Sequence, residues 1–153
     1  SAASDVYKRQ IRILPMSEDE FYGYVDTDSV TSIKDMQEMF FKQDLKSKRN
    51  GIFKIKESHF KTAIGSLILF QYKKHLIASA VYDGTFKISE DLEDYKNGYK
   101  EYYLFKPDTI RVFSPISEEE FQEIKEIKFQ QAKHKIDYNK LEAIEKIIKN
   151  EKY

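Results

Sequence analysis

The chain has 153 residues, which suits one domain with a sizeable hydrophobic core. It contains no cysteine, which excludes disulfides, cysteine-type zinc sites and thiol catalysis and favours a reducing, cytoplasmic location. No apolar run is long enough to span a bilayer, so no membrane partner is expected. Lysine plus arginine and aspartate plus glutamate both total 26, so the net charge does not identify a partner.

The opening segment, SAASDVYKRQ, has no hydrophobic periodicity and no helix cap. It resembles the translation of a transposase sequencing adaptor of the kind found in assembled metagenomic reads; a natural polar arm is the alternative. We therefore expect residues 1–10 to contribute nothing to the fold. Residues 11–153 are expected to form a single domain, either complete or a fragment of a longer protein.

A strand and two helix starts are predicted in the first third of the chain. Residues 11–14 include two β-branched isoleucines and end at Pro15, which indicates a short strand. In PMSEDEF, Ser17 is placed as an N-cap and Glu20 at the third helical position, which is a capping box. Residues 29–43 carry apolar side chains at helical spacing, so a second helix is predicted there.

The middle of the chain is predicted to be rich in strands, entered through the Asn50-Gly51 turn. Tight connections at 73–75 and 106–108 are each expected to turn an antiparallel hairpin. Residues 78–80 are small, which indicates close approach of another backbone or a ligand. The predicted strands are 52–56, 64–72, 76–84, 99–105 and 109–113.

Alternation along the central hairpin predicts which of its side chains are buried. Leu67, Leu69 and Ile77 are expected in the core, with Phe70 or Tyr72 on the other face.

Two further helix starts are predicted near the C-terminus. Ser117 and Glu120 form a second capping box, and Asp137 is a good N-cap for a helix whose apolar residues share one face. The chain is therefore assigned to the α+β class, as a small bent antiparallel sheet or pseudo-barrel flanked by helices at both ends.

Recognisable catalytic motifs are few. Asp108 followed by Glu123 and Lys125 resembles a nuclease metal pattern, but the latter two follow a capping box and would diverge on a helix. The three histidines lack ligand spacing. We therefore expect no metal, no cofactor and no enzyme activity in this chain, and keep an enzyme with an unrecognised site as an alternative.

Charge distribution points to a candidate site. Residues 42–61 contain seven basic and two acidic residues, a local charge of +5, whereas residues 89–101 are acidic. Basic residues beside aromatic ones grip phosphates and stack bases. A solvated lysine-rich face, with the aromatic residues in the core, is the alternative. The candidate nucleic-acid-binding residues are Lys48, Arg49, Phe53, Lys54, Lys56 and Tyr72.

The segment IGSLILFQYKKHLIASAVYDG resembles the central hairpin of the PUA-like superfamily, which includes the ASCH and EVE domains. Gly65 matches the pattern of those domains, and Ser66 stands where an acidic residue is frequent. YYLFKPDTIRVFSPIS, followed by FQQAKHKIDYNKLEAI, is similar to the end of PUA-like modules that precede HNH nuclease domains in prokaryotic proteins. The resemblance covers residues 11–148.

The resemblance implies a pseudo-barrel flanked by helices, with a cleft that receives a nucleobase. It implies a nucleic-acid-binding module, for DNA or RNA, that recognises a modified or extruded base in a prokaryotic defence or RNA-associated system. A nuclease domain in the full-length protein is the partner it suggests. A non-catalytic protein-interaction or small-ligand-binding domain is the alternative.

Overall fold

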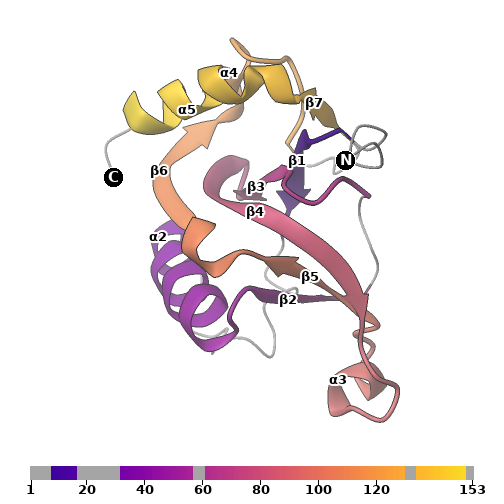
Figure 1. Cartoon of the computed structure of the whole chain (residues 1–153). Helices are drawn as coiled ribbons and strands as arrows, with labels where there is room; N and C mark the ends of the chain where they lie inside the picture. The colour runs from indigo at the N-terminus through magenta and orange to yellow at the C-terminus, as the bar shows by residue number, and fades with distance from the viewer. Residues whose placement is uncertain (1–7, 17–31, 57–60, 130–133, 151–153) are drawn as a thin grey trace.

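The computed structural model describes residues 8–16, 32–56, 61–129 and 134–150. Seven strands within these residues form one bent sheet, through which the long strand β4 curves (Figure 1). Neighbouring strands are antiparallel except β1 and β3, which are parallel. The strands are, in sheet order, β2 (Ile52–Ile55), β5 (Glu101–Phe105), β4 (His75–Lys87), β3 (Leu67–Tyr72), β1 (Gln10–Pro15) and β7 (Lys135–Asp137), with β6 (Arg111–Ser117) also paired to β4.

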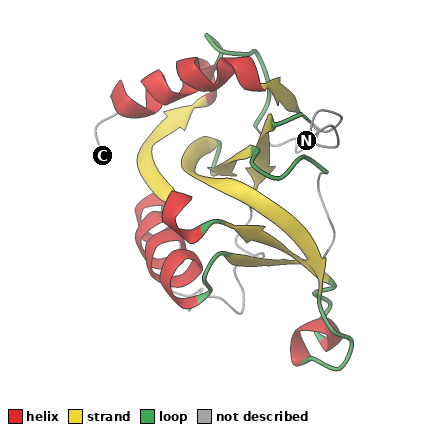
Figure 2. Ribbon diagram, viewed as in Figure 1, coloured by secondary structure: helices red, strands yellow, loops and turns green. Residues whose placement is uncertain are grey.

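Helices pack beside this sheet, so the predicted α+β class with a bent sheet is confirmed (Figure 2). The short helix α2 leads directly into η2, which has π-helical hydrogen bonding. The helical elements are α2 (Ile33–Asp35), η2 (Met36–Lys48), α3 (Glu93–Lys96), η3 (Pro107–Thr109), α4 (Glu118–Phe121), η4 (Tyr138–Lys140) and α5 (Leu141–Asn150).

The predicted hairpin between residues 99–105 and 109–113 is wrong. Both segments contain strands, but β5 and β6 pair with different stretches of β4 rather than with each other. The turn η3 separates them, and the hydroxyl of Thr109 accepts a hydrogen bond from the Val81 N–H (2.9 Å). An irregularity in β4 between Tyr82 and Thr85, where Gly84 has a φ of 121°, lets the strand change direction there.

The helix predicted at 29–43 begins at Ile33 and runs on to Lys48, with residues 29–31 outside the described part. Gln37 fixes it to the sheet, because its side-chain amide donates hydrogen bonds to the carbonyls of Ile77 (2.9 Å) and Phe113 (2.6 Å). The chain then turns at Asn50-Gly51, as predicted. A Cβ on Gly51 would lie 1.9 Å from the carbonyl oxygen of Phe105, so glycine is required there.

The C-terminal helix starts are as predicted. Ser117 and Glu120 form a complete capping box at α4. Asp137 caps the turn η4, which leads into α5, and accepts a hydrogen bond from the Asn139 N–H (3.0 Å). The other predicted capping box, at Ser17 and Glu20, lies outside the described residues.

Two hydrophobic cores lie against the sheet. We call them the η2 core, which includes Phe40, Phe70 and Tyr103, and the α5 core, which includes Leu69, Phe121 and Ile144. Every residue of β3 is buried because the two cores cover its opposite faces.

The burial predicted for the central hairpin is confirmed for all three core positions. Leu67 and Leu69 lie in the α5 core, whereas Phe70 and Tyr72 lie in the η2 core on the other face. Ile77 also belongs to the η2 core, so it does not share a face with the two leucines.

The N-terminal boundary needs one correction. Strand β1 begins at Gln10, which pairs with Asp137 of β7 and donates its backbone N–H to the Ser66 hydroxyl (2.9 Å). The expectation that residues 1–10 contribute nothing to the fold is therefore wrong for Gln10. Residues 1–7 lie outside the described part, and the single domain at 11–153 stays a prediction.

Candidate nucleic-acid interface

Strand β2 separates the basic residues of its segment from the aromatic one. Phe53 and Ile55 point into the η2 core, so the alternation of a strand places Lys54 and Lys56 on the opposite face. Phe53 is 2% exposed and its ring lies 5.9 Å from that of Phe40, between centroids. Phe53 therefore has no open face for a base, which corrects its place among the candidate residues.

Tyr72 is corrected for the same reason. It is 2% exposed and belongs to the η2 core, because both faces of β3 are covered. The ammonium group of Lys73 lies 5.5 Å from the centroid of its ring. An incoming base has no access to this ring.

Three of the four candidate cations lie near one buried carboxylate, that of Asp44 in η2. Burial raises the pKa of Asp44, and the charges of Arg49, Lys48 and Lys54 act in the opposite direction. Arg49 Nε is 3.5 Å from Asp44 Oδ1. Part of the basic charge in this segment therefore compensates a buried acid, which is a structural function.

Lys54 and Lys56 also contact the segment between β4 and β5. Lys54 Nζ is 2.9 Å from Asp94 Oδ2, and Lys56 Nζ lies 5.4 Å from the centroid of the Tyr99 ring. The structure thus brings Lys54 and Lys56 together on one face of β2, with Lys48 and Arg49 at the end of η2. That these four residues bind phosphates stays a prediction.

Two other aromatic residues lie beside Lys54. Tyr102 of β5 is directly opposite Lys54 of β2. On the other edge of β5, Tyr102 is directly opposite Phe86 of β4. Residues directly opposite in antiparallel strands present their side chains on the same face. The rings of Phe86 and Tyr102 are stacked, with centroids 5.5 Å apart and an interplanar angle of 27°.

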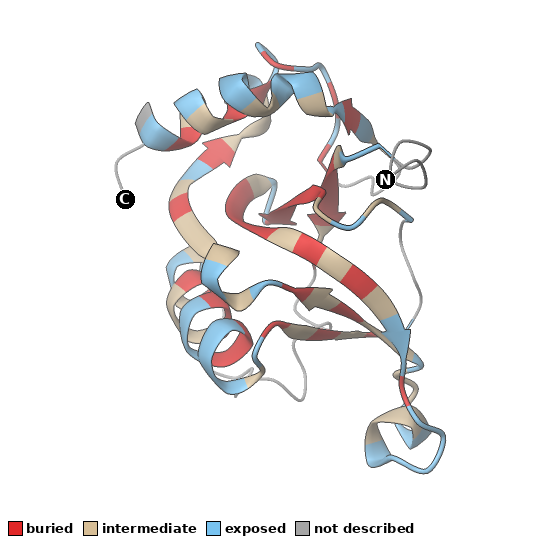
Figure 3. Ribbon diagram, viewed as in Figure 1, coloured by how far each residue is buried: buried red, intermediate tan, exposed pale blue. Residues whose placement is uncertain are grey.

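The end of β4 is exposed to solvent (Figure 3), and Tyr102 beside it is partly exposed. Phe86 is 44% exposed and Ile64 is 61% exposed. Both lie next to Gly84, where a Cβ would come within 3.1 Å of the Phe86 ring and 3.9 Å of Ile64. We call Lys54, Ile64, Phe86 and Tyr102 the outer patch.

The outer patch has the chemistry of a base-stacking platform. Exposed aromatic faces bind unstacked bases of any sequence, and nearby ammonium groups bind the phosphates. Phe86 and Tyr102 were not among the residues predicted from the sequence. Strand alternation was the available signal. It places Phe53 and Lys54 on opposite faces of β2, so an aromatic neighbour of Lys54 has to come from another strand.

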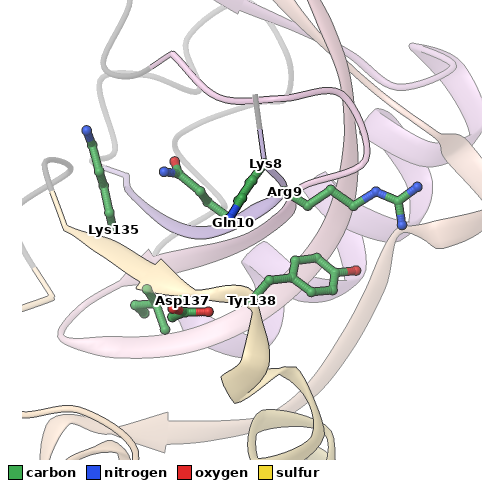
Figure 4. Close-up of a pocket in the computed structure, with 7 residues that line it drawn as sticks. Lys8, Arg9, Gln10, Lys135, Asp137 and Tyr138 are labelled. Atoms are coloured by element: carbon green, nitrogen blue, oxygen red, sulfur yellow. The ribbon is translucent and has the colours of Figure 1, made fainter. Parts of the chain in front are cut away.

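A pocket of about 740 Å³ lies elsewhere, between the start of β1 and strand β7 (Figure 4). Lys8, Arg9 and Lys135 contribute three cations to its lining and Asp137 one carboxylate. In Figure 4 the side chains of Arg9 and Tyr138 extend in the same direction, and Lys135 projects away from them. Because Lys8 and Arg9 belong to the segment that resembles an adaptor, we do not assign the function to this pocket.

The described part of the chain contains neither a cluster of metal ligands nor a helix that could span a membrane. No group of three or more histidine, aspartate or glutamate residues there is arranged to hold a metal ion. Among the helices described, none has the length and apolar character needed to cross a membrane.

Solved structures with a similar fold include two domains of different organisms. The chain is similar to an ASCH protein from Zymomonas mobilis, with a TM-score of 0.51 and 14% identity over 92% of this chain and 95% of that one. It is also similar to the YTH domain of Zygosaccharomyces rouxii MRB1, solved in complex with N6-methyladenosine RNA. That match has a TM-score of 0.50 and 14% identity over 95% of this chain and 88% of that one.

No family model and no curated protein matches the sequence. The fold predicted from the resemblance to PUA-like, ASCH-like modules is confirmed by the structural similarity.

Proposed function

We propose that this chain is a nucleic-acid-binding module whose outer patch binds single strands. A base stacks on the Phe86–Tyr102 ring pair, and Lys54 and Lys56 contact the adjoining phosphates. The observation that carries the proposal is the stacked ring pair of Phe86, which is exposed, and Tyr102, which is partly exposed and lies directly opposite Lys54. An aromatic pair outside the hydrophobic cores, with one ring exposed to solvent, favours a function in binding.

Stacking is expected to supply most of the affinity. Each stacked base contributes about 1–3 kcal/mol. Two phosphate contacts give a slope of about −1.4 for log affinity against log salt on single strands, which is a weak salt dependence for a nucleic-acid-binding protein. Duplexes are poor ligands because their bases are already stacked and paired.

A modified base is the ligand class that the similar YTH structure suggests, since that domain was solved with N6-methyladenosine RNA. The defence or RNA-associated setting and a nuclease domain in the full-length protein belong to the same proposal. They are supported only by the sequence resemblance to modules that precede HNH nucleases.

A second candidate is a protein-interaction domain. Ile64, Phe86 and Leu92 are large apolar side chains that are exposed to solvent. Exposed apolar residues also mark sites where another protein docks. This alternative predicts no binding to oligonucleotides of any kind.

The experiment is a fluorescence-anisotropy titration at two salt concentrations. The probes are labelled single-stranded RNA, single-stranded DNA, a duplex, and single-stranded RNA containing N6-methyladenosine. All variants carry Lys8→Ala and Arg9→Ala, so that the pocket near β1 adds no binding. We expect single strands to bind and the duplex to bind at least tenfold less tightly. Folded protein that binds none of the probes at low salt would favour the protein-interaction alternative.

Matched variants locate the binding surface. Tyr102→Phe keeps the ring and should retain the affinity, whereas Tyr102→Leu keeps an apolar side chain and should lose about 1–3 kcal/mol. Phe86→Leu should behave like Tyr102→Leu. Equal affinities for the phenylalanine and leucine variants of Tyr102 would show that the bases do not stack at this patch.

A further inference from the structure

The acidic segment between β4 and β5 folds back onto β2. Its base is fixed by backbone hydrogen bonds from the Lys100 N–H to the Ile55 carbonyl (3.2 Å) and from the Ile88 N–H to the Lys100 carbonyl (2.9 Å). The helix α3 lies within this segment, away from the main body of the sheet in Figure 1. Residues 89–101 carry five carboxylates and two lysines, so the segment is net negative.

One carboxylate of this segment is bound to the outer patch. Asp94 Oδ2 lies 2.9 Å from Lys54 Nζ, the ammonium group that the proposed function assigns to a phosphate. The Asp94 side chain is 39% exposed and that of Lys54 only 17%. Asp94 thus presents an anionic oxygen to Lys54 from the solvent side, in the way that a phosphate oxygen would.

We propose that Asp94 is a built-in competitor of the nucleic-acid backbone at Lys54, an inference that rests on the proposed function. A phosphate reaches Lys54 by displacing the Asp94 carboxylate. Displacement is feasible because a partly exposed ion pair is weak, worth about 0–1 kcal/mol. Because Asp94 is on the same chain, its effective concentration at Lys54 is high, and a free phosphate ion competes poorly with it.

The competitor makes the patch selective for a base and a phosphate on one strand. A strand that stacks a base on the ring pair holds its phosphate close to Lys54, so its phosphate also acts at a high effective concentration. Inorganic phosphate has no base to hold it near Lys54, so it displaces the Asp94 carboxylate less readily than a strand does. We therefore expect phosphate ions to compete weakly against a bound oligonucleotide.

The test is Asp94→Asn, which removes the charge and keeps the size of the side chain. Its matched control is Glu93→Gln, the same change of charge at the preceding, exposed position of α3. Asp94→Asn should bind single strands about two- to fivefold more tightly, the range expected for loss of a weak competing ion pair. Glu93→Gln should change the affinity much less, since exposed charges at a distance are screened.

Two further measurements fix the cause. The affinity of Asp94→Asn should depend more steeply on salt, because binding to the wild-type chain releases an Asp94 carboxylate that takes up a cation. In a Lys54→Ala background, Asp94→Asn should give no gain, because the ion pair is already absent. Thermal midpoints of all variants should agree within about 2 °C, since an exposed pair contributes little to stability.

The outcomes separate the two proposals. If the wild-type chain binds and Tyr102→Leu weakens binding, but Asp94→Asn binds no more tightly than Glu93→Gln, the competitor inference is wrong and the proposed function stands. A gain from Asp94→Asn that persists in the Lys54→Ala background also overturns the inference. If neither the wild-type chain nor Asp94→Asn binds any oligonucleotide, both proposals are wrong.

Discussion

The two halves of β4 differ in what covers them. From Leu76 to Ala80 every residue is buried, whereas from Tyr82 to Lys87 burial alternates and ends in two exposed residues. The first half contributes side chains to both cores, with Leu76 in the α5 core and Ile77 in the η2 core. The second half contributes Tyr82 to the η2 core and presents Phe86 to solvent on the other face.

This difference shows where a functional surface is to be sought. In the covered half, aromatic and apolar residues are explained by packing, and a large side chain there says nothing about binding. In the open half, the stacked rings of Phe86 and Tyr102 lie outside both cores, and Phe86 is 44% exposed, so core packing does not explain them. Mutations in the two halves are therefore expected to have different effects.

The largest contrast is between two adjacent tyrosines of β5 that point to opposite faces. Tyr103 is fully buried in the η2 core, and Tyr102 lies on the open face. Tyr103→Ala should lower the free energy of unfolding by about 3–5 kcal/mol, the range for large buried aromatic residues. Tyr102→Ala should lower it by about 1 kcal/mol or less, because it loses only cross-strand contacts. Chemical denaturation measures both, and similar losses would contradict the assignment of faces.

The covered half of the sheet is tested at Leu69, in β3 opposite Ser79 of β4. Leu69→Ala should cost about 2–5 kcal/mol of stability, because it leaves a cavity in the α5 core. Ile64→Ala is the control, an exposed aliphatic residue that should cost less than about 0.5 kcal/mol. A near-neutral Leu69→Ala would mean that this core is not closely packed.

The open half is tested through its salt dependence. In the Asp94→Asn background, where binding releases no carboxylate, Lys54→Ala should reduce the slope of log affinity against log salt by about 0.7, the contribution of one phosphate contact on a single strand. Lys73→Ala, at the exposed connection between β3 and β4, should leave the slope unchanged. Equal slopes for Asp94→Asn with and without Lys54→Ala would remove Lys54 from the interface and leave stacking as the binding force.

The smallest expected effect is on the pH dependence of stability, and it comes from Asp44, the buried carboxylate in η2. Burial raises its pKa in the folded state, so the folded chain holds the proton more tightly than the unfolded chain does. The contribution of Asp44 to the free energy of unfolding therefore falls as the pH rises from the ordinary aspartate pKa, about 4, through the raised value. Asp44→Asn should flatten this part of the profile of thermal midpoint against pH. Parallel profiles for the two proteins would show that Asp44 does not titrate abnormally.

Much of the fold could be predicted from local chemistry. The capping box at Ser117, the N-cap at Asp137 and the burial of Leu67, Leu69 and Ile77 each follow from a few neighbouring residues, and each is confirmed. The pairing of β5 and β6 could not be predicted in this way. A short connection favours a hairpin, but the bend of β4 at Gly84 offers each strand a separate partner.

The candidate site was predicted less well because it depends on which strands are neighbours. Lys54 and Phe53 are adjacent in sequence and lie on opposite faces of β2, which strand alternation alone indicates. The aromatic neighbours of Lys54, Tyr102 and Phe86, are far from it in sequence and are joined to it only by the sheet order. The charge of +5 in residues 42–61 overstated the basic surface, since Asp94, from outside this segment, pairs with Lys54.

The central claim is that bases stack on the open face at Phe86 and Tyr102. The most direct test is NMR of the chain with ¹³C-labelled tyrosine and phenylalanine rings, titrated with a single-stranded oligonucleotide. We predict that the ring resonances of Tyr102 and Phe86 shift as binding saturates, while those of the buried Phe53 and Tyr72 stay in place. Saturable binding that shifts the Tyr138 ring and leaves Tyr102 and Phe86 unchanged would contradict the account and place the ligand in the pocket near β1.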